Sequence, residues 1–486
     1  MTATAAARVA RAPSASWPRV AGICAAISLA SLVVPATLAF DPWAWLVWGR
    51  EVGRWTLDTV GGPSWKPLPV AATVLLAPLG PLAAPAYLLV ARTAALLAVV
   101  AVARLAGRSG GTVAAVLAGA LLWLTPDGDP RFLRLVLEGH EAPWSAGLAV
   151  AGLLAVVDRR PGWALAATWL LSLLRPEAWP FLLALVVCSW LPLVAPGLVP
   201  GARTDGMWSF RARGTLRWWG LAALASIPVL WFVPDWIGSG SPLHGASTAQ
   251  VLADQPLGER LVDSLATLVG SVPGPAWLLA AGAVALAWRR GDRVPAALAA
   301  AALAWSALVV AMAAVAGYAA LSRFFLPGAA VVVALAAAGV VELWTLVRTA
   351  GDRRALAGAL ALALLGAGML VPRTVGLADI VDEVAERGRL EDDLDRTIER
   401  AGGAAALRGC GAGVVTGGTL LRSAVAWKLD LPLSDVVLRV PDRPAVLLLE
   451  SPRAIELARS RPGTVELAAG ERWTAFAMRC GSVSGG

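Results

Sequence analysis

The segment VAGICAAISLASLVVPATLAFDPWAWLVWGR, residues 20–50, determines how the rest of this chain is interpreted. Residues 20–40 are apolar and long enough to cross a bilayer as one helix. Asp41 then stands at the membrane boundary, followed by three tryptophans and Arg50. Tryptophan is enriched in the headgroup layer, which accounts for the aromatic residues. A carboxylate at that depth is costly unless water or a partner reaches it, so Asp41 needs a further explanation.

The composition of the whole chain indicates a membrane protein. Of 486 residues, 58% are hydrophobic and 15% are charged, and the mean hydropathy is +0.68. These values are too apolar for a soluble protein of this length. The net charge of +8 comes from arginine, because Lys66 and Lys428 are the only lysines. Most arginines lie in short loops between apolar segments, which favours positive-inside bias over nucleic-acid binding.

Long apolar segments recur along the chain and predict about eleven membrane spans. They cover residues 20–40, 83–106, 112–125, 144–157, 162–174, 178–197, 216–233, 268–288, 295–316, 325–348 and 355–371. The first run has features of a signal peptide but lacks a clear cleavage site, so we favour an uncleaved first span behind a tail of residues 1–19. Residues 67–80 are short and proline-rich, and we expect an interfacial or re-entrant piece of the loop 41–82.

The distribution of arginine between loops predicts the orientation in the membrane. One set of alternate loops holds Arg104, Arg108, Arg159, Arg160, Arg203, Arg211, Arg213, Arg217, Arg289, Arg290, Arg293, Arg348, Arg353 and Arg354. The other set holds fewer basic residues, namely Arg50, Arg54, Lys66, Arg131, Arg134, Arg175, Arg260 and Arg323. We therefore expect a multi-pass protein of the cell membrane with a cytoplasmic N-terminus and an extracytoplasmic C-terminus.

The composition changes after Pro372, which predicts a separate small domain. Residues 380–400 are charged with helical periodicity, and short apolar runs follow at 413–416, 436–439, 444–449, 464–467 and 473–479. This pattern predicts an extracytoplasmic α/β domain over residues 372–486. Cys410 and Cys480 both fall in it, and a disulfide between them would suit an outer location; two unpaired buried thiols are the alternative.

Charged residues gather in the loops that this topology places on the outer face. They include Asp41, Lys66, His140, Glu141, Arg175, Glu177 and Arg323. Charged groups that cluster at one membrane face indicate a water-filled cavity. A carboxylate can take a proton from an attacking hydroxyl, and arginines can bind a phosphate and stabilise it as a leaving group. Attack on an anomeric carbon with departure of a lipid phosphate needs both.

The order of these residues resembles the GT-C superfamily of membrane glycosyltransferases, especially bacterial members that use polyprenyl-phosphate sugars. The shared pattern starts with Asp41 after the first span and an aromatic-rich helix that ends near Gly49-Arg50. It continues with Trp65-Lys66-Pro67-Leu68-Pro69, Gly139-His140-Glu141 with Pro143, Arg175-Pro176-Glu177 and Arg323-Phe324-Phe325-Leu326-Pro327. The resemblance covers roughly residues 20–350.

The resemblance implies an all-α polytopic membrane domain over residues 20–371 that transfers a sugar from a polyprenyl-phosphate donor to a cell-envelope glycan or glycolipid. It implies Asp41 as the general base. The family often has a second acid next to this one; here Pro42 takes its place, which argues against a metal, and we expect no cofactor. The substrate contacts are expected from Arg50, Lys66, His140, Glu141, Arg175, Glu177 and Arg323.

Simpler roles compete with these assignments. Asp41 can cap the next helix, with Pro42 at its first position. Arg175 and Glu177 can form an ion pair at a turn, and Arg323 can extend its charge to the membrane interface. Arg92 lies within the second span, where an arginine either has a function or pairs with an acid. For the whole chain, the alternatives are a transporter or flippase for an envelope lipid and a non-enzymatic envelope scaffold. No paired inverted repeats with interrupted helices support the transporter.

Overall fold

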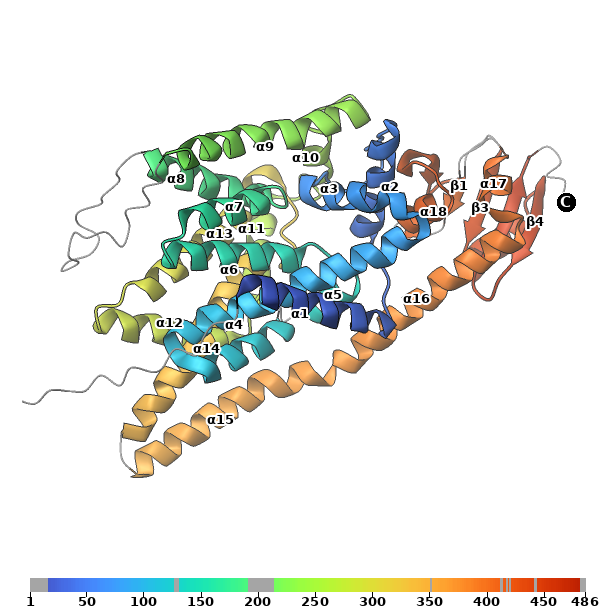
Figure 1. Ribbon diagram of the computed structural model, residues 1–486. Coiled ribbons are helices and arrows are strands. Elements are labelled where there is room, and N and C mark those ends of the chain that lie inside the picture. The colour runs from blue at the N-terminus through green and yellow to red at the C-terminus, as the bar shows by residue number, and fades with distance from the viewer. Residues whose placement is uncertain are drawn as a thin grey trace, which may run out of the picture.

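The structure is a body of long helices joined to a small sheet domain at one end (Figure 1). This computed structural model describes residues 16–125, 131–190, 214–349, 352–410, 414–416, 418, 421–440 and 444–480. Residues 1–15 of the predicted tail, the end of the predicted span 178–197, and the loop arginines Arg203, Arg211 and Arg213 lie outside the described residues.

The helical body extends from α1 to α15. Its α-helices are α1 (Trp17–Ala30), α2 (Phe40–Arg54), α3 (Pro67–Leu76), α4 (Ala83–Trp123), α5 (Phe132–Leu137), α6 (Ala142–Val157), α7 (Pro161–Ser172), α8 (Trp179–Trp190), α9 (Leu216–Ser239), α10 (His244–Thr248), α11 (Leu257–Gly270), α12 (Gly274–Arg289), α13 (Val294–Ala316), α14 (Ser322–Thr349) and α15 (Asp352–Val375). Three short 3-10 helices join them: η1 (Ser31–Val33), η2 (Ala77–Leu82) and η3 (Pro176–Ala178).

Helices occupy the apolar segments that the sequence marks as spans, but their number differs from the prediction. Among the described residues, four helical runs are long and apolar enough to cross a membrane, namely Pro67–Trp123, Leu216–Ser239, Val294–Ala316 and Ser322–Thr349. A fifth appears if α11 and α12, bent by 74°, form one broken span. The count of about eleven is therefore not confirmed, because several apolar helices are shorter than a bilayer requires.

Three boundaries also differ from the prediction. The first span ends early, because helical structure stops at Val33 and the chain leads to α2 without regular structure. The predicted span 268–288 divides between α11 and α12. The piece expected at 67–80 is α3 and the start of η2, and its helical path breaks at Gly80, where φ is +56°. Glycine carries no Cβ and adopts this left-handed φ without strain.

A second glycine separates two predicted spans within α4. The two helical parts of α4 meet at Gly111, which has φ +65° and ψ −159°. The residues on either side correspond to the predicted segments 83–106 and 112–125. A Cβ placed on Gly119 would lie 3.4 Å from Val99, so the two parts fold back on one another. The chain needs a residue with a free φ at this reversal.

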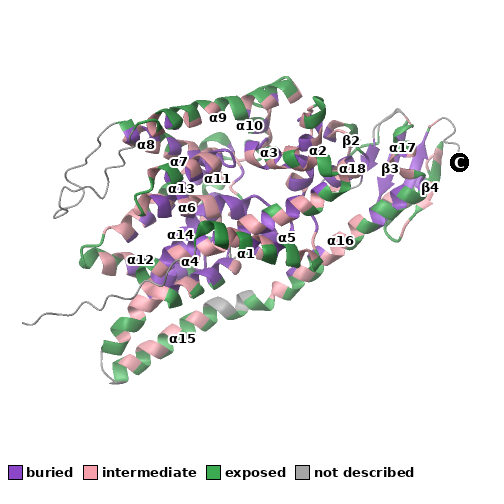
Figure 2. Ribbon diagram, viewed as in Figure 1, coloured by how far each residue is buried: buried purple, intermediate pink, exposed green. Residues whose placement is uncertain are grey.

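Helix α14 is the centre of the helical body. Every residue from Phe324 to Gly339 is buried, and the helix packs against α4, α6, α12 and α13 (Figure 2). Its sequence there is mostly alanine, valine and glycine, and small residues allow helix backbones to approach closely. A Cβ on Gly339 would collide with the carbonyl oxygen of Leu279 on α12. The burial of α14 also determines where its first residues, including Arg323, are held.

The C-terminal region contains the predicted sheet. It is formed by α16 (Leu377–Arg400), α17 (Gly403–Arg408), β1 (Val414–Thr416), α18 (Arg422–Lys428), η5 (Leu433–Asp435), β2 (Val436–Val437), β3 (Ala445–Leu449), α19 (Pro452–Arg459), β4 (Thr464–Ala469) and β5 (Thr474–Met478). The strand order is β2-β1-β3-β5-β4, with β1 parallel to β2 and β3, and β5 antiparallel to β3 and β4. Each short apolar run in the sequence overlaps one of these strands. A mostly helical chain with a small C-terminal sheet is therefore confirmed.

Ion pairs join several arginine-rich loops at the end of the body away from the sheet (Figure 1). Arg108 in the turn of α4 binds Asp158 after α6. Arg290 after α12 binds Glu342 near the end of α14, with 2.6 Å between Nη2 and Oε2. These loops belong to the set that the sequence analysis placed together on one face.

We expect the disulfide between Cys410 and Cys480 to stabilise the C-terminal domain. The bridge closes a loop with a sequence separation of 70 residues. Chain-entropy arguments for a loop of this size predict a loss of about 4 kcal/mol of domain stability in Cys410→Ser/Cys480→Ser. Thermal unfolding in detergent, followed by the protection of residues 414–478 from hydrogen exchange, measures this effect. Cys188→Ser, which removes a free thiol on α8, is the control; an equal loss in both variants would contradict the expectation.

Candidate active site

Five charged side chains from distant parts of the chain meet at the end of the body that faces the sheet domain. They are Asp41, Lys66, Glu141, Arg175 and Arg323. Each lies at or directly before the start of a helix: α2, α3, α6, η3 and α14. We call these five residues the charge cluster. The structure therefore brings together residues that the sequence analysis selected from five separate motifs.

Proline sets the local backbone at two of these positions. Lys66 precedes Pro67, and Arg175 precedes Pro176. A residue before proline is pushed out of the helical region, and both residues are extended, with φ and ψ of −136° and 113° at Lys66 and −142° and 122° at Arg175. Proline then begins the next helix. Each of these two dipeptides therefore contains both an extended cationic residue and the first residue of the next helix.

Glu141 is the centre of the charge cluster. Its Oε1 lies 2.5 Å from Lys66 Nζ and 2.9 Å from Arg175 Nη2. The side chains of Glu141 and Arg175 have no solvent exposure. Burial opposes the charged form of Glu141, but the charges of Lys66 and Arg175 outweigh it and hold the pKa of Glu141 well below its usual value. Glu141 is therefore a buried carboxylate held between two cations.

Asp41 is bound more loosely and is closer to solvent. Its Oδ2 lies 3.4 Å from Arg323 Nη2 and 3.7 Å from Lys66 Nζ, and its side chain is 12% exposed. Asp41 does not take the alternative role of helix cap, because Ala39 is the N-cap of α2 and no side-chain capping bond is formed there. Pro42 lies within the first turn of the helix rather than at its first position. Asp41 therefore has a partly exposed carboxylate beside two cations.

Aromatic rings hold the cations of the charge cluster. The guanidinium carbon of Arg175 lies 4.0 Å from the centre of the Phe324 ring, and that of Arg323 lies 5.5 Å from the same ring. Tyr318 stacks on Phe324 at 5.2 Å, and Lys66 Nζ lies 5.2 Å from the Trp45 ring. Cation–π contacts of this kind stabilise a charge without using its hydrogen-bond donors. Nε and Nη1 of Arg175 and Nε of Arg323 have no acceptor among the described residues.

His140 connects Glu141 to a second carboxylate, Glu138. His140 Nε2 lies 3.5 Å from Glu138 Oε2, and Nδ1 lies 3.9 Å from Glu141 Oε2. Burial lowers the pKa of His140, but the nearby carboxylates of Glu138 and Glu141 outweigh burial and raise it. Arg387 on α16 binds Glu138 in turn. The sequence analysis did not select Glu138 or Arg387, and no local pattern links two residues so far apart in the chain.

Gly139 explains how His140 and Glu141 reach this place. Its φ of +70° makes a sharp turn after α5 that an L side chain would adopt only with strain. A Cβ there would lie 2.8 Å from a methyl group of Leu38. Tyr87 donates a hydrogen bond to the Gly139 carbonyl at 3.2 Å, which fixes the turn against α4.

Two residues from the sequence analysis lie apart from the charge cluster. Arg50 donates to the carbonyls of Trp427 at 3.1 Å and Leu431 at 2.9 Å, and pairs with Asp430 at 3.0 Å. It binds the C-terminal domain rather than the cluster, so we leave it out of the candidate site. Arg92 donates to the carbonyl and the hydroxyl of Ser31 and thereby completes the end of α1; it pairs with no acid among the described residues.

Glu177 lies next to the cluster, behind Arg175. It is fully buried, and neither of its carboxylate oxygens has a hydrogen-bond partner among the described residues. Among the charged side chains, Arg175 interacts most strongly with Glu177. Within the described part of the chain, no three or more histidine, cysteine or acidic side chains are arranged to hold a metal ion. The absence of a metal requirement stays a prediction.

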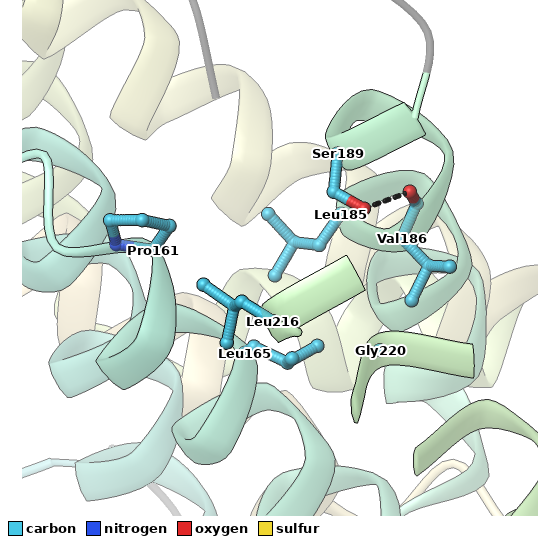
Figure 3. A pocket seen from close by; sticks show the side chains of 7 residues that line it. All are labelled: Pro161, Leu165, Leu185, Val186, Ser189, Leu216 and Gly220. Atoms are coloured by element: carbon cyan, nitrogen blue, oxygen red, sulfur yellow. Dashed lines mark hydrogen bonds between the residues drawn. The ribbon is translucent and has the colours of Figure 1, made fainter. Parts of the chain in front are cut away.

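Two apolar hollows in the surface of the described residues lie apart from the charge cluster. Figure 3 shows a small apolar crevice lined by Pro161, Leu165, Leu185, Val186, Ser189, Leu216 and Gly220. The Ser189 hydroxyl donates to the Val186 carbonyl at 2.6 Å, so the one polar side chain there is already satisfied. A larger apolar groove runs along α12, α13 and α14, with Trp277 and Trp288 in its wall and Arg289 at its edge. Both are lined almost entirely by apolar side chains.

The comparisons with known proteins identify the fold. No protein-family model matches the chain, and none of the curated proteins matches it. The structure of ArnT from Cupriavidus metallidurans bound to undecaprenyl phosphate matches with a TM-score of 0.56 and 17% identity, over 97% of this chain and 99% of that one. The apo state of the same protein matches over the same shares, with a TM-score of 0.51 and 16% identity.

A more distant match is to a protein that is longer than this chain. An oligosaccharyltransferase from Archaeoglobus fulgidus matches over 85% of this chain and 63% of that one, with 14% identity and a TM-score of 0.49. We base no argument on it. The ArnT structures show that this chain shares their overall fold over nearly its whole length.

We expect Glu141→Gln to destabilise the protein strongly. The substitution leaves Lys66 and Arg175 buried without their shared counter-charge. Breaking a buried ion pair in this way costs about 3–5 kcal/mol. The apparent unfolding temperature in detergent measures the loss. Glu383→Gln is the matched control, because Glu383 is 59% exposed in its pair with Arg134 and exposed pairs contribute little. A loss no larger than that of the control would show that Glu141 is not the centre of the cluster.

The raised pKa of His140 predicts a dependence of stability on pH. A group whose pKa is higher in the folded state stabilises the fold fully below its unfolded value, which is 6.5 for histidine. This contribution is lost as the pH rises through the higher folded value. The unfolding temperature should therefore fall as the pH rises above 6.5 and through the higher folded value, and the slope should be smaller in His140→Gln. Equal slopes in the two proteins would contradict the charged state of His140.

Proposed function

We propose that this chain is a membrane glycosyltransferase that moves a sugar from a polyprenyl-phosphate donor to a cell-envelope glycan or glycolipid. The observation that carries the proposal is the meeting of an accessible carboxylate, Asp41, with Lys66 and Arg323 at one end of the body. A match to a structure of ArnT bound to undecaprenyl phosphate supports a lipid-linked donor. The reaction needs one group to take a proton and others to bind a departing phosphate.

Asp41 is the proposed general base. Both neighbouring cations approach its Oδ2, which leaves Oδ1 to face the acceptor hydroxyl. The acceptor oxygen forms a bond to the anomeric carbon of the donor while the bond from that carbon to the phosphate oxygen breaks. The hydroxyl proton passes to Asp41, and the lipid phosphate leaves with the electron pair of the broken bond. Asp41 later returns the proton to water.

Lys66 and Arg323 are the proposed phosphate ligands. Their side chains are 9% and 19% exposed, whereas Arg175 and Glu141 are completely buried. A donor phosphate can therefore reach Lys66 and Arg323 directly. Arg175 acts from behind them, because it shares Glu141 Oε1 with Lys66 and so fixes the position of the ammonium group. A preorganised cation stabilises charge that develops on the leaving oxygen without reorganisation.

His140 and Glu177, two further residues of the sequence motifs, lie beside the charge cluster. His140 lies between Glu138 and Glu141, and Glu177 lies behind Arg175. Glu177 is fully buried, and Glu138 and Glu141 flank the His140 ring. We therefore propose that His140 and Glu177 set the charge balance around Lys66 and Arg175 rather than bind the substrate.

We further propose that the charge cluster faces the outer side of the membrane. Arginine-rich loops join at the opposite end of the body through Arg108 and Arg290. Positive-inside bias places that end in the cytoplasm. On this orientation, residues 20–371 form the membrane domain, and residues 372–486 form an extracytoplasmic domain above the site.

We expect Asp41→Asn to abolish sugar transfer. The amide cannot accept the proton of the acceptor hydroxyl, and the loss of a general base typically costs about 10²–10⁴-fold in rate. Purified protein with a labelled polyprenyl-phosphate sugar and membrane acceptor measures the transfer. The control is Asp263→Asn, which changes an exposed carboxylate on α11.

Two results would contradict the proposed function. Full transfer by Asp41→Asn would remove Asp41 from catalysis. Movement of the lipid across liposomes by the wild-type protein, with no labelled product, would favour a flippase. Unfolding temperatures of the two variants need to agree, so that a loss of activity reports on chemistry.

A further inference from the structure

The segment that carries Asp41 is held by the C-terminal domain and not by the helical body alone. Between the end of η1 at Val33 and the start of α2 at Phe40, the chain has no regular structure. Its path is therefore fixed by packing of its buried residues and by hydrogen bonds to other parts of the protein, one of which runs from Ala39 N to the Glu138 carbonyl at 3.0 Å. Asp41 is the second residue of the helix that follows.

Glu391 on α16 binds this segment on both sides of Asp41. Its Oε1 accepts a hydrogen bond from Thr37 Oγ1 at 2.5 Å and another from Trp43 Nε1 at 3.1 Å. Thr37 and Trp43 are both buried, with exposures of 5% and 6%. One carboxylate oxygen thus joins a donor four residues before Asp41 to a donor two residues after it. Hydrogen bonds to a charged acceptor are about twice as strong as neutral ones.

Helix α18 provides a second attachment at the same point. The Ser423 hydroxyl donates to the carbonyl of Phe40, the residue next to Asp41, at 2.9 Å. Lys428 on α18 lies 5.7 Å from the ring of Trp43. At the other end of α2, Arg50 donates to the carbonyls of Trp427 and Leu431. Both ends of α2 are therefore attached to the C-terminal domain (Figure 1).

We propose that Glu391 is a positioning residue for Asp41. It fixes the chain on both sides of the carboxylate, so that the C-terminal domain takes part in aiming the base at the acceptor hydroxyl. This proposal rests on the proposed function, because it gives the geometry of Asp41 a catalytic consequence. Glu391 itself touches no residue of the charge cluster among the described contacts.

The size of the expected effect follows from the geometry that a base needs. A displacement of about 1 Å in a reacting group can reduce the rate by about 10²-fold. Glu391→Ala removes both hydrogen bonds and should lower kcat by about 10–100-fold, with the KM for the donor unchanged, since Lys66 and Arg323 stay in place. In Glu391→Gln, the amide oxygen can accept from both donors, so this variant should recover most of the lost rate.

The experiment compares these variants with Glu386→Ala. Glu386 lies on the same helix, α16, but its side chain is 42% exposed. It pairs with Arg389 and Arg472, away from α2. Two measurements are made on each purified protein. One is kcat and KM for transfer from the labelled donor, and the other is hydrogen–deuterium exchange of the peptides that cover residues 34–48. Faster exchange and a lower kcat in Glu391→Ala, with neither change in Glu386→Ala, are the expected results.

Three outcomes would overturn the proposal. They are an unchanged exchange rate in Glu391→Ala, an unchanged kcat, and a change confined to KM. A second pair of variants, Thr37→Val and Trp43→Phe, removes the donors while keeping their shapes, and their combination should match Glu391→Ala. If the wild-type protein transfers no sugar, the proposed function fails, and with it the catalytic role of Glu391; exchange then reports only whether Glu391 holds the segment.

Discussion

The shared ion pair of Glu141 with Lys66 and Arg175 is the interaction on which the arrangement at this end of the protein depends. A buried charge needs a partner, because the interior solvates it poorly. Two cations and one carboxylate therefore hold the starts of α3, α6 and η3 in one place. Asp41, which is bound more loosely, and Arg323, which is partly exposed, lie next to this buried ion-pair network.

The second constraint is the contact between α2 and the C-terminal domain. Arg50, which the sequence motifs assigned to substrate, donates to the Trp427 carbonyl in the last turn of α18 and to the Leu431 carbonyl in the segment that follows it. Glu391 and Ser423 hold the start of α2 in the same way. The helix that carries Asp41 is thus shared between the membrane body and the sheet domain, so the two parts cannot move independently without moving the carboxylate.

Local patterns predicted the helical segments, the five strands and the positions of the charged motifs, because hydropathy and proline act over a few residues. The ends of the first span and the break between α11 and α12 were missed. So were Glu138 and Arg387, which bind each other across the chain. These features depend on contacts between distant segments, and no spacing rule in the sequence reports them. Whether the clustered residues perform the proposed chemistry stays a prediction.

By itself the sequence predicted a helical membrane body and a small sheet after the last apolar segment, and the structure contains such a sheet. Only the tertiary structure decided that Glu141 binds both cations, that Asp41 remains open, and that Arg50 and Glu391 serve the attachment of α2. The physical reason is that a charged side chain can pair with any of several oppositely charged groups. The packing of the helices determines which of these groups lies within pairing distance.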